Sequence, residues 1–181
     1  MTDFLAWPRA VLTLEDWEAL PDEVHRRCEL VEGTLLVTTS PALGHQRVLR
    51  RLLRRLEDAL PDGLEVLPGT ELLCDAGPPA TVRRPDLAVF RAGLPDRMPH
   101  LLPPDVVGVV EVLSPGTRRT DRVAKVYDYA EAGVGWYLVV DPDCAAMTLF
   151  VLPADGTGPY DCAERDEPVV ELPGVGAVSL G

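Results

Sequence analysis

Two carboxylates lie in apolar segments of the sequence, and a single lysine follows them on the next predicted helix. Asp86 opens the predicted strand 86–90 within the segment RRPDLAVF (83–90), and Glu111 interrupts the apolar run 106–113 (VVGVVEVL) near its end. A buried carboxylate costs free energy unless a cation pairs with it, and two carboxylates brought together repel each other. A hard divalent ion such as Mg²⁺ or Mn²⁺ relieves that repulsion and can activate a bound water as a nucleophile. The pattern therefore indicates metal-assisted hydrolysis.

Lys125 follows on the next predicted helix, and it is the one lysine among 17 basic residues. A position that stays lysine in such an arginine-rich chain suggests a need for a compact ammonium with a shiftable pKa. In one interpretation Lys125 reaches back to Glu111, where it holds or deprotonates the attacking water or stabilises charge on a phosphate. In the other it is a surface partner of Asp121 at i,i+4, worth only a few tenths of a kcal/mol.

Several helices and strands must position these residues. Thr13 and Asp16 resemble a capping box that opens a helix ending before Pro21, and residues 28–39 predict a hairpin that turns at Glu32–Gly33. The longest predicted helix spans 41–60 and carries His45 in its first turn. The helix at about 117–132 is expected to bury an apolar face made of Val123, Val126, Tyr127 and Ala130.

The predicted strands are 64–67, 71–74, 86–90, 106–113 and 135–140, with two more in the tail at 147–152 and 168–172. Strands mixed with helices in this order favour an α/β domain with a mixed central sheet. No internal repeat or domain-scale linker interrupts the chain, so residues 1–181 are expected to form a single domain.

Composition narrows the class of protein. The formal net charge is −12, which taken whole argues against a nucleic-acid partner, although the acidic residues concentrate in the C-terminal part. The four cysteines lack the spacing of a zinc site or a disulfide scaffold. No apolar run is long enough to span a membrane, and the N-terminus lacks secretory features, so a cytoplasmic protein is expected.

Several motifs together resemble a known family. They are ELVEG (29–33), PALGHQ (41–46), RRPDLAVF (83–90) and VVEVLSPGTRRTDRVAKVYDYAEAGVGWYLVVDP (109–142). The set resembles the bacterial putative restriction endonuclease family (Uma-type domain) of the PD-(D/E)XK nuclease superfamily. The resemblance covers roughly residues 29–180 and is most specific between Pro85 and Pro142.

The resemblance implies a restriction-endonuclease-like αβββαβ core around a mixed sheet, with an N-terminal hairpin and extra C-terminal strands. It implies Asp86 and Glu111 as metal ligands, with the backbone carbonyl of Leu113 as a third. The superfamily pattern has a lysine two residues after the glutamate, where this chain has Leu113; the looser family pattern takes the lysine from the following helix, at Lys125.

Other residues at family positions keep two interpretations. Glu29 either completes the metal site or orients its water, or it is only a charge on a hairpin strand. His45 either donates a hydrogen bond behind the metal ligands or contacts a phosphate, or it is only a histidine at the start of a helix. Arg118, Arg119 and Arg122 lie close to the proposed chemistry and are predicted phosphate contacts. The arginines of the long helix either form a solvated face or hold a phosphate backbone: Arg47, Arg50, Arg51, Arg54 and Arg55.

The sequence thus predicts a Mg²⁺- or Mn²⁺-dependent endonuclease acting on DNA, and a homodimer is expected because many nucleases cut two strands. One alternative is a catalytically inactive protein of the same fold that binds a nucleic acid or protein partner. The net charge of −12 and the broken lysine spacing favour that alternative. A structural subunit of a homo-oligomer is a third, weaker hypothesis.

Overall fold

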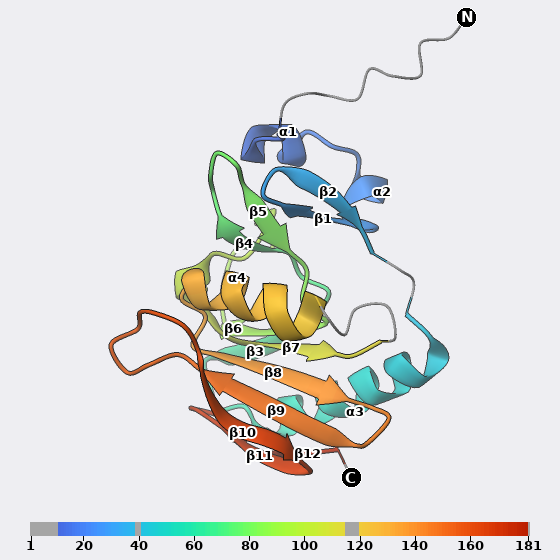
Figure 1. Cartoon of the computed structure of the whole chain (residues 1–181), viewed down its shortest axis with the longest axis vertical. Helices are drawn as coiled ribbons and strands as arrows, with labels where there is room; N and C mark the ends of the chain where they lie inside the picture. Colours follow the sequence, from blue (N-terminus) through green and yellow to red (C-terminus); the bar gives the residue numbers. More distant parts are fainter. Residues whose placement is uncertain (1–10, 39–40, 115–119, 181) are drawn as a thin grey trace, which may run out of the picture.

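A computed structural model describes residues 11–38, 41–114 and 120–180, without the side chains of 164–166. Its centre is a six-stranded sheet in the order β10-β9-β8-β7-β6-β3, in which β7 and β8 run parallel and the other pairs antiparallel (Figure 1). The strands are β3 (Leu64–Pro68), β6 (Leu87–Arg91), β7 (Val106–Val112), β8 (Trp136–Asp141), β9 (Ala146–Val151) and β10 (Asp161–Glu167).

Helices cover both faces of this sheet, because its central strands are apolar on both sides. On one face α3 (Leu43–Ala59) packs Val48, Leu52 and Leu56 against even-numbered β7 residues such as Val110. On the other face α4 (Lys125–Glu131) packs against odd-numbered β7 residues. Glu111 has an odd number and therefore points toward α4.

A second sheet of four strands lies above α4 in Figure 1, in the order β2-β1-β5-β4. Its register sets Leu30 opposite Val82, so that Glu29 and Arg83 are brought near each other. Its strands are β1 (Cys28–Val31), β2 (Thr34–Val37), β4 (Leu72–Asp75) and β5 (Thr81–Arg83).

Short elements complete the described fold. The hairpin of β11 (Val169–Leu172) and β12 (Gly176–Ser179) adds Val170, Leu172 and Val178 to the core under α3. The remaining elements are α1 (Leu14–Glu18), α2 (Asp22–His25), the 3₁₀ turn η1 (Pro103–Asp105) and the π-helical turn η2 (Thr120–Ala124). Every helix in these ranges is too short or too polar to cross a bilayer.

The predicted α/β class and mixed sheet are confirmed. The αβββαβ core corresponds to α3, β3, β6, β7, α4 and β8, and the capping box of Thr13 and the turn at Glu32–Gly33 also form. The sequence prediction missed α2, β5, β10 and β12. It also began the strand of Asp86 one residue early, because Asp86 precedes β6.

The predicted buried face of the helix after β7 is wrong in part. Ala130 is buried, but Val123 and Tyr127 are 64% and 66% exposed. The side chains turned inward are instead Asp121, Lys125 and Tyr129. The prediction assumed that the apolar residues face the core, whereas here a polar stripe at i, i+4, i+8 does so.

The close approach of β7 and β8 depends on Gly108. A Cβ built on Gly108 would lie 2.0 Å from Cδ2 of Trp136, its register partner on β8. The indole occupies the space that any side chain at position 108 would need, and it is 1% exposed.

We expect Gly108→Ala to lower the free energy of unfolding by about 1–3 kcal/mol, because the added methyl overpacks the core. Chemical denaturation monitored by tryptophan fluorescence measures the change. Gly44→Ala is the matched control: a Cβ there meets nothing within 4 Å, and alanine in the helix should stabilise by up to about 1 kcal/mol. Equal effects of the two substitutions would contradict the assignment of Gly108 as a packing position.

Candidate active site

Asp86 and Glu111 lie at the same edge of the sheet, where β6 begins and the antiparallel β7 ends. Leu87 of β6 pairs with Val110 of β7, so the residue before β6 comes beside the residue after Val110. Asp86 is anchored there through Oδ2, which accepts hydrogen bonds from the backbone N–H of Val112 at 2.7 Å and from Nε2 of His45 at 3.1 Å. The first turn of α3 supplies His45, which thereby orients Asp86.

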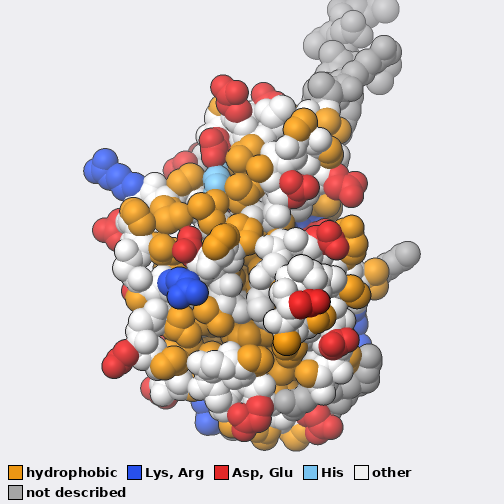
Figure 2. Space-filling view, turned by 90° about the vertical axis from the view of Figure 1, so that its left-hand side faces the viewer, with side chains coloured by type: hydrophobic (Ala, Val, Ile, Leu, Met, Phe, Trp, Pro, Cys, Tyr) orange, Lys and Arg blue, Asp and Glu red, His pale blue; other side chains and the backbone are white. Residues whose placement is uncertain are grey.

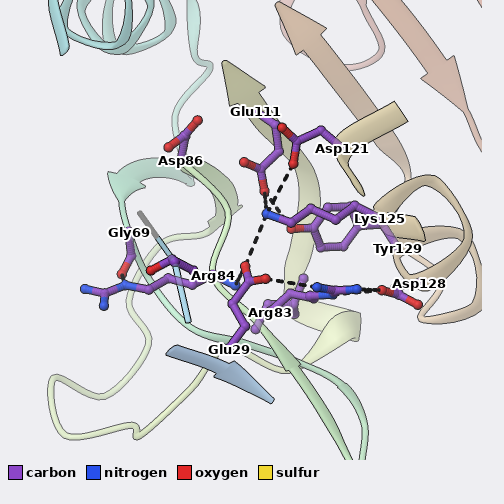
Figure 3. A network of polar contacts seen from close by, with 12 residues as sticks. Glu29, Gly69, Arg83, Arg84, Asp86, Glu111, Asp121, Lys125, Asp128 and Tyr129 are labelled. Atoms are coloured by element: carbon purple, nitrogen blue, oxygen red, sulfur yellow. Dashed lines mark hydrogen bonds and ion pairs between the residues drawn. The ribbon is translucent and has the colours of Figure 1, made fainter. Parts of the chain in front are cut away.

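Lys125 lies at the centre of the described polar cluster. Its Nζ donates to Oε1 of Glu111 at 2.6 Å and lies 3.1 Å from Oε1 of Glu29 and 3.7 Å from Oδ1 of Asp121. Figure 3 shows these three carboxylates around the ammonium, one each from β7, β1 and η2. Lys125 reaches back to Glu111, as one sequence interpretation has it, and also pairs with Asp121, as the other has it. The pair with Asp121 is buried, however, whereas the sequence interpretation placed it on the surface.

The π-helical turn η2 places this polar stripe. Asp121 lies in η2, and Lys125 and Tyr129 follow in α4. The Tyr129 hydroxyl donates to Oε1 of Glu111 at 3.0 Å, beside the bond from Lys125. Isolated π-helical turns occur often at functional sites, where the extra residue shifts the side chains that follow.

Arg83 connects the small sheet to α4. Its guanidinium donates to Oε2 of Glu29 at 2.9 Å and, through Nε, to Oδ2 of Asp128 at 2.7 Å. Glu29 also accepts from the backbone N–H of Arg84 at 3.0 Å. The sequence reasoning missed Arg83, Asp128 and Tyr129 as site residues. The run RRPD was a signal for Arg83, but β5, which carries Arg83, was not predicted.

Burial and charge set the ionisation of these groups. Burial raises the pKa of Glu111 well above its usual range, against the effect of Lys125 and with further repulsion from Asp86. Burial also opposes ionisation of Glu29, but the charges of Lys125 and Arg83 outweigh it and lower its pKa.

The same balance keeps Lys125 a cation. Burial alone would lower its pKa, but the charges of Glu111, Glu29 and Asp121 raise it above the ordinary lysine value. A lysine held protonated in this way stabilises negative charge and orients oxygen atoms. This favours the charge-stabilising role considered from the sequence, and the deprotonating role stays a prediction.

The polar cluster is poor in positive charge. Five carboxyl groups, including Asp86, which pairs with His45, lie around two cations, Lys125 and Arg83. Such a buried excess of carboxyl groups favours either a further cation or a proton, and the raised pKa of Glu111 marks it as the group that takes the proton when no further cation is present.

Comparison with known proteins identifies the family. The model of the Uma2 family, described as "Putative restriction endonuclease", matches residues 14–180. The chain belongs to the Uma2 family. This confirms the family resemblance seen in the sequence. A comparison with curated proteins found no significant match.

The fold of this Uma2 protein also occurs in a solved structure. That structure is of "a putative nuclease belonging to DUF820" from Anabaena variabilis, with a TM-score of 0.72 and 16% sequence identity. The match covers 93% of this chain and 95% of the other. At this identity the likeness supports the restriction-endonuclease-like fold.

The donor atoms of the Uma2 site fit a hard divalent ion in part. Among the described residues, Oδ1 of Asp86 and Oε2 of Glu111 accept no hydrogen bond, because the bonds to both residues go to the other oxygen. Magnesium is commonly bound by one or two carboxylates and several waters. No group of three or more histidine, cysteine or acidic side chains in the described ranges is arranged to hold a metal ion.

Four predicted site residues lie outside the polar cluster around Lys125 or outside the described residues. Leu113 follows β7 with its side chain buried and its N–H bonded to the Val140 carbonyl at 2.8 Å, so the expected lysine position belongs to the core. Arg122 is 42% exposed and pairs with Asp141 at 3.3 Å rather than with Glu111 or Asp86. Arg118 and Arg119 lie outside the described residues.

We expect Lys125→Met to destabilise the protein by about 3–5 kcal/mol, because it leaves buried carboxylates without their cation. Without the Lys125 charge, the pKa of Glu111 rises further and the lowering of the Glu29 pKa is weakened, so the folded state holds more protons than in the wild type and stability falls more steeply as pH rises. Urea denaturation at pH 5.5, 7 and 8.5 measures this slope. Lys125→Arg keeps the charge and should restore the wild-type slope, and a Lys125→Met slope equal to wild type would contradict the assignment.

Proposed function

We propose that this Uma2 protein is a metal-dependent endonuclease that hydrolyses phosphodiester bonds in DNA. The observation that carries the proposal is the convergence of Asp86, Glu111 and Lys125 at the ends of β6 and β7. The family description as a restriction endonuclease supports the choice of DNA as the substrate.

In this proposal the ion is Mg²⁺ or Mn²⁺, held by Asp86 and Glu111, with the Leu113 carbonyl as a further ligand. When bound, such an ion supplies Lewis-acid activation of the phosphodiester and of water. The excess of carboxyl groups over cations supports this assignment. So does the fact that one oxygen each of Asp86 and Glu111 accepts no hydrogen bond from the part of the chain that the structure describes.

The chain's own residues then have separate roles. His45 and the N–H of Val112 fix the orientation of Asp86. Lys125 and Tyr129 fix Glu111, and the Lys125 ammonium stabilises the charge that develops on the phosphate. Glu29 holds Lys125 in place, and Arg83 fixes Glu29 in turn.

Asp86→Asn tests the proposal most directly. The amide oxygen can still accept the Val112 N–H, so the change removes charge with little effect on shape. Loss of a residue that only supports a metal ligand typically lowers metal affinity or activity about 10–100-fold. Asp86→Asn removes a proposed ligand itself, so we expect a loss at least that large. The measurements are Mn²⁺ binding by calorimetry and nicking of supercoiled plasmid in Mg²⁺ or Mn²⁺.

Asp62→Asn is the matched control, because Asp62 is exposed beyond the end of α3 and should change neither readout. Wild-type protein that binds neither metal and cuts no form of DNA would refute the proposal. Metal binding without cleavage would favour instead the inactive nuclease-fold protein. A homodimer, expected from the sequence, can be checked in the same preparations by ultracentrifugation.

A further inference from the structure

Five arginines line the outer face of α3. Arg47, Arg50, Arg51, Arg54 and Arg55 are all exposed, while Val48, Leu52 and Leu56 are buried against the sheet. At 3.6 residues per turn, positions 47, 50, 51 and 54 fall within an arc of about 100°, on the side of the helix away from the buried arc. We call these four residues the α3 arginine face.

This face carries charge without local compensation. No acidic residue occurs in α3 before Glu57 and Asp58. The side chains of the α3 arginine face make no hydrogen bond or ion pair with the described residues. Like charges four positions apart, such as Arg47 with Arg51 and Arg50 with Arg54, destabilise a helix by a few tenths of a kcal/mol per pair. The arrangement therefore costs the free protein stability.

The rest of the protein makes the face unusual. The chain has 29 acidic residues against 17 basic ones. On the side of the molecule drawn in Figure 2, acidic side chains are scattered over the surface and basic ones are sparse. A concentration of positive charge on one helix of an acidic protein is the electrostatic footprint of a polyanion-binding surface.

The α3 arginine face belongs to the helix whose first turn reaches the candidate active site, although it lies on the outer side of that helix. His45, two residues before Arg47, reaches Asp86 at 3.1 Å from the first turn of the same helix. The α3 arginine face then runs for about 10 Å along the helix, the axial length of about three nucleotides of one DNA strand.

We propose that the α3 arginine face binds the phosphate backbone of double-stranded DNA. The choice of DNA as the polyanion rests on the function proposed above. Exposed arginines without ion-pair partners hold phosphates without reading bases, so the contact positions the duplex and is independent of sequence. The repulsion along the helix is relieved when the backbone neutralises it.

The test measures binding of the full-length chain to a labelled DNA duplex by fluorescence anisotropy in EDTA, across a range of salt concentrations. The variant is R47Q/R50Q/R51Q/R54Q. We expect at least a tenfold loss of affinity at low salt. The slope of log K against log salt should shrink by about 3–4, since each lost phosphate contact removes about 0.9. The variant should melt no lower than wild type, because the repulsion is gone.

The matched control is R26Q/R27Q/R91Q/R97Q, which removes the same charge from four exposed arginines elsewhere. It should bind within about twofold of wild type. Equal weakening of both variants, or an unchanged salt slope in the α3 variant, would overturn the proposal. So would tighter binding of single-stranded RNA than of duplex DNA.

Binding in EDTA is scored without cleavage, so the two proposals fail separately. A chain that binds DNA through α3 and never cuts it refutes only the nuclease function. A chain that cuts DNA while the α3 variant binds as tightly as wild type refutes only the α3 contact.

Discussion

The ammonium of Lys125 holds together parts of the fold that hydrophobic packing alone would leave independent. Glu111 sits on the main sheet, Glu29 on the small sheet and Asp121 on the π-helical turn, and all three approach the same nitrogen atom. Burial makes each carboxylate costly unless this cation is present, and makes the cation costly without them. The docking of the small sheet against α4 therefore depends on charge matching in the interior.

Arg83 adds a second connection to the same junction. It joins Glu29 to Asp128, so the small sheet contacts α4 through one arginine and one lysine that share a carboxylate. Removing any member leaves the others unmatched, and effects of substitutions in this network should therefore be strongly coupled. A network of this kind holds Glu111 in a fixed orientation, which a metal site requires.

The predictable part of this structure was local. Continuous apolar runs indicated β7 and β8, and the position of Asp86 at the start of one strand and of Glu111 near the end of the next followed from single charges in such runs. The sequence pattern did not predict which polar residues are buried. Lys125 and Tyr129 face inward while Val123 and Tyr127 face solvent, which inverts the pattern used to assign a helix face. Arg83 was missed because its three-residue strand is too short to show a period.

The inverted face of the segment 120–131 changes how it responds to temperature. Opening this segment would hydrate several charged groups together with apolar surface. Exposed polar surface lowers the heat capacity of unfolding while apolar surface raises it. The local opening reaction should therefore have a small heat-capacity change, and its free energy should vary almost linearly with temperature. The core beneath it, built from valine, leucine and tryptophan, follows the usual strongly curved dependence.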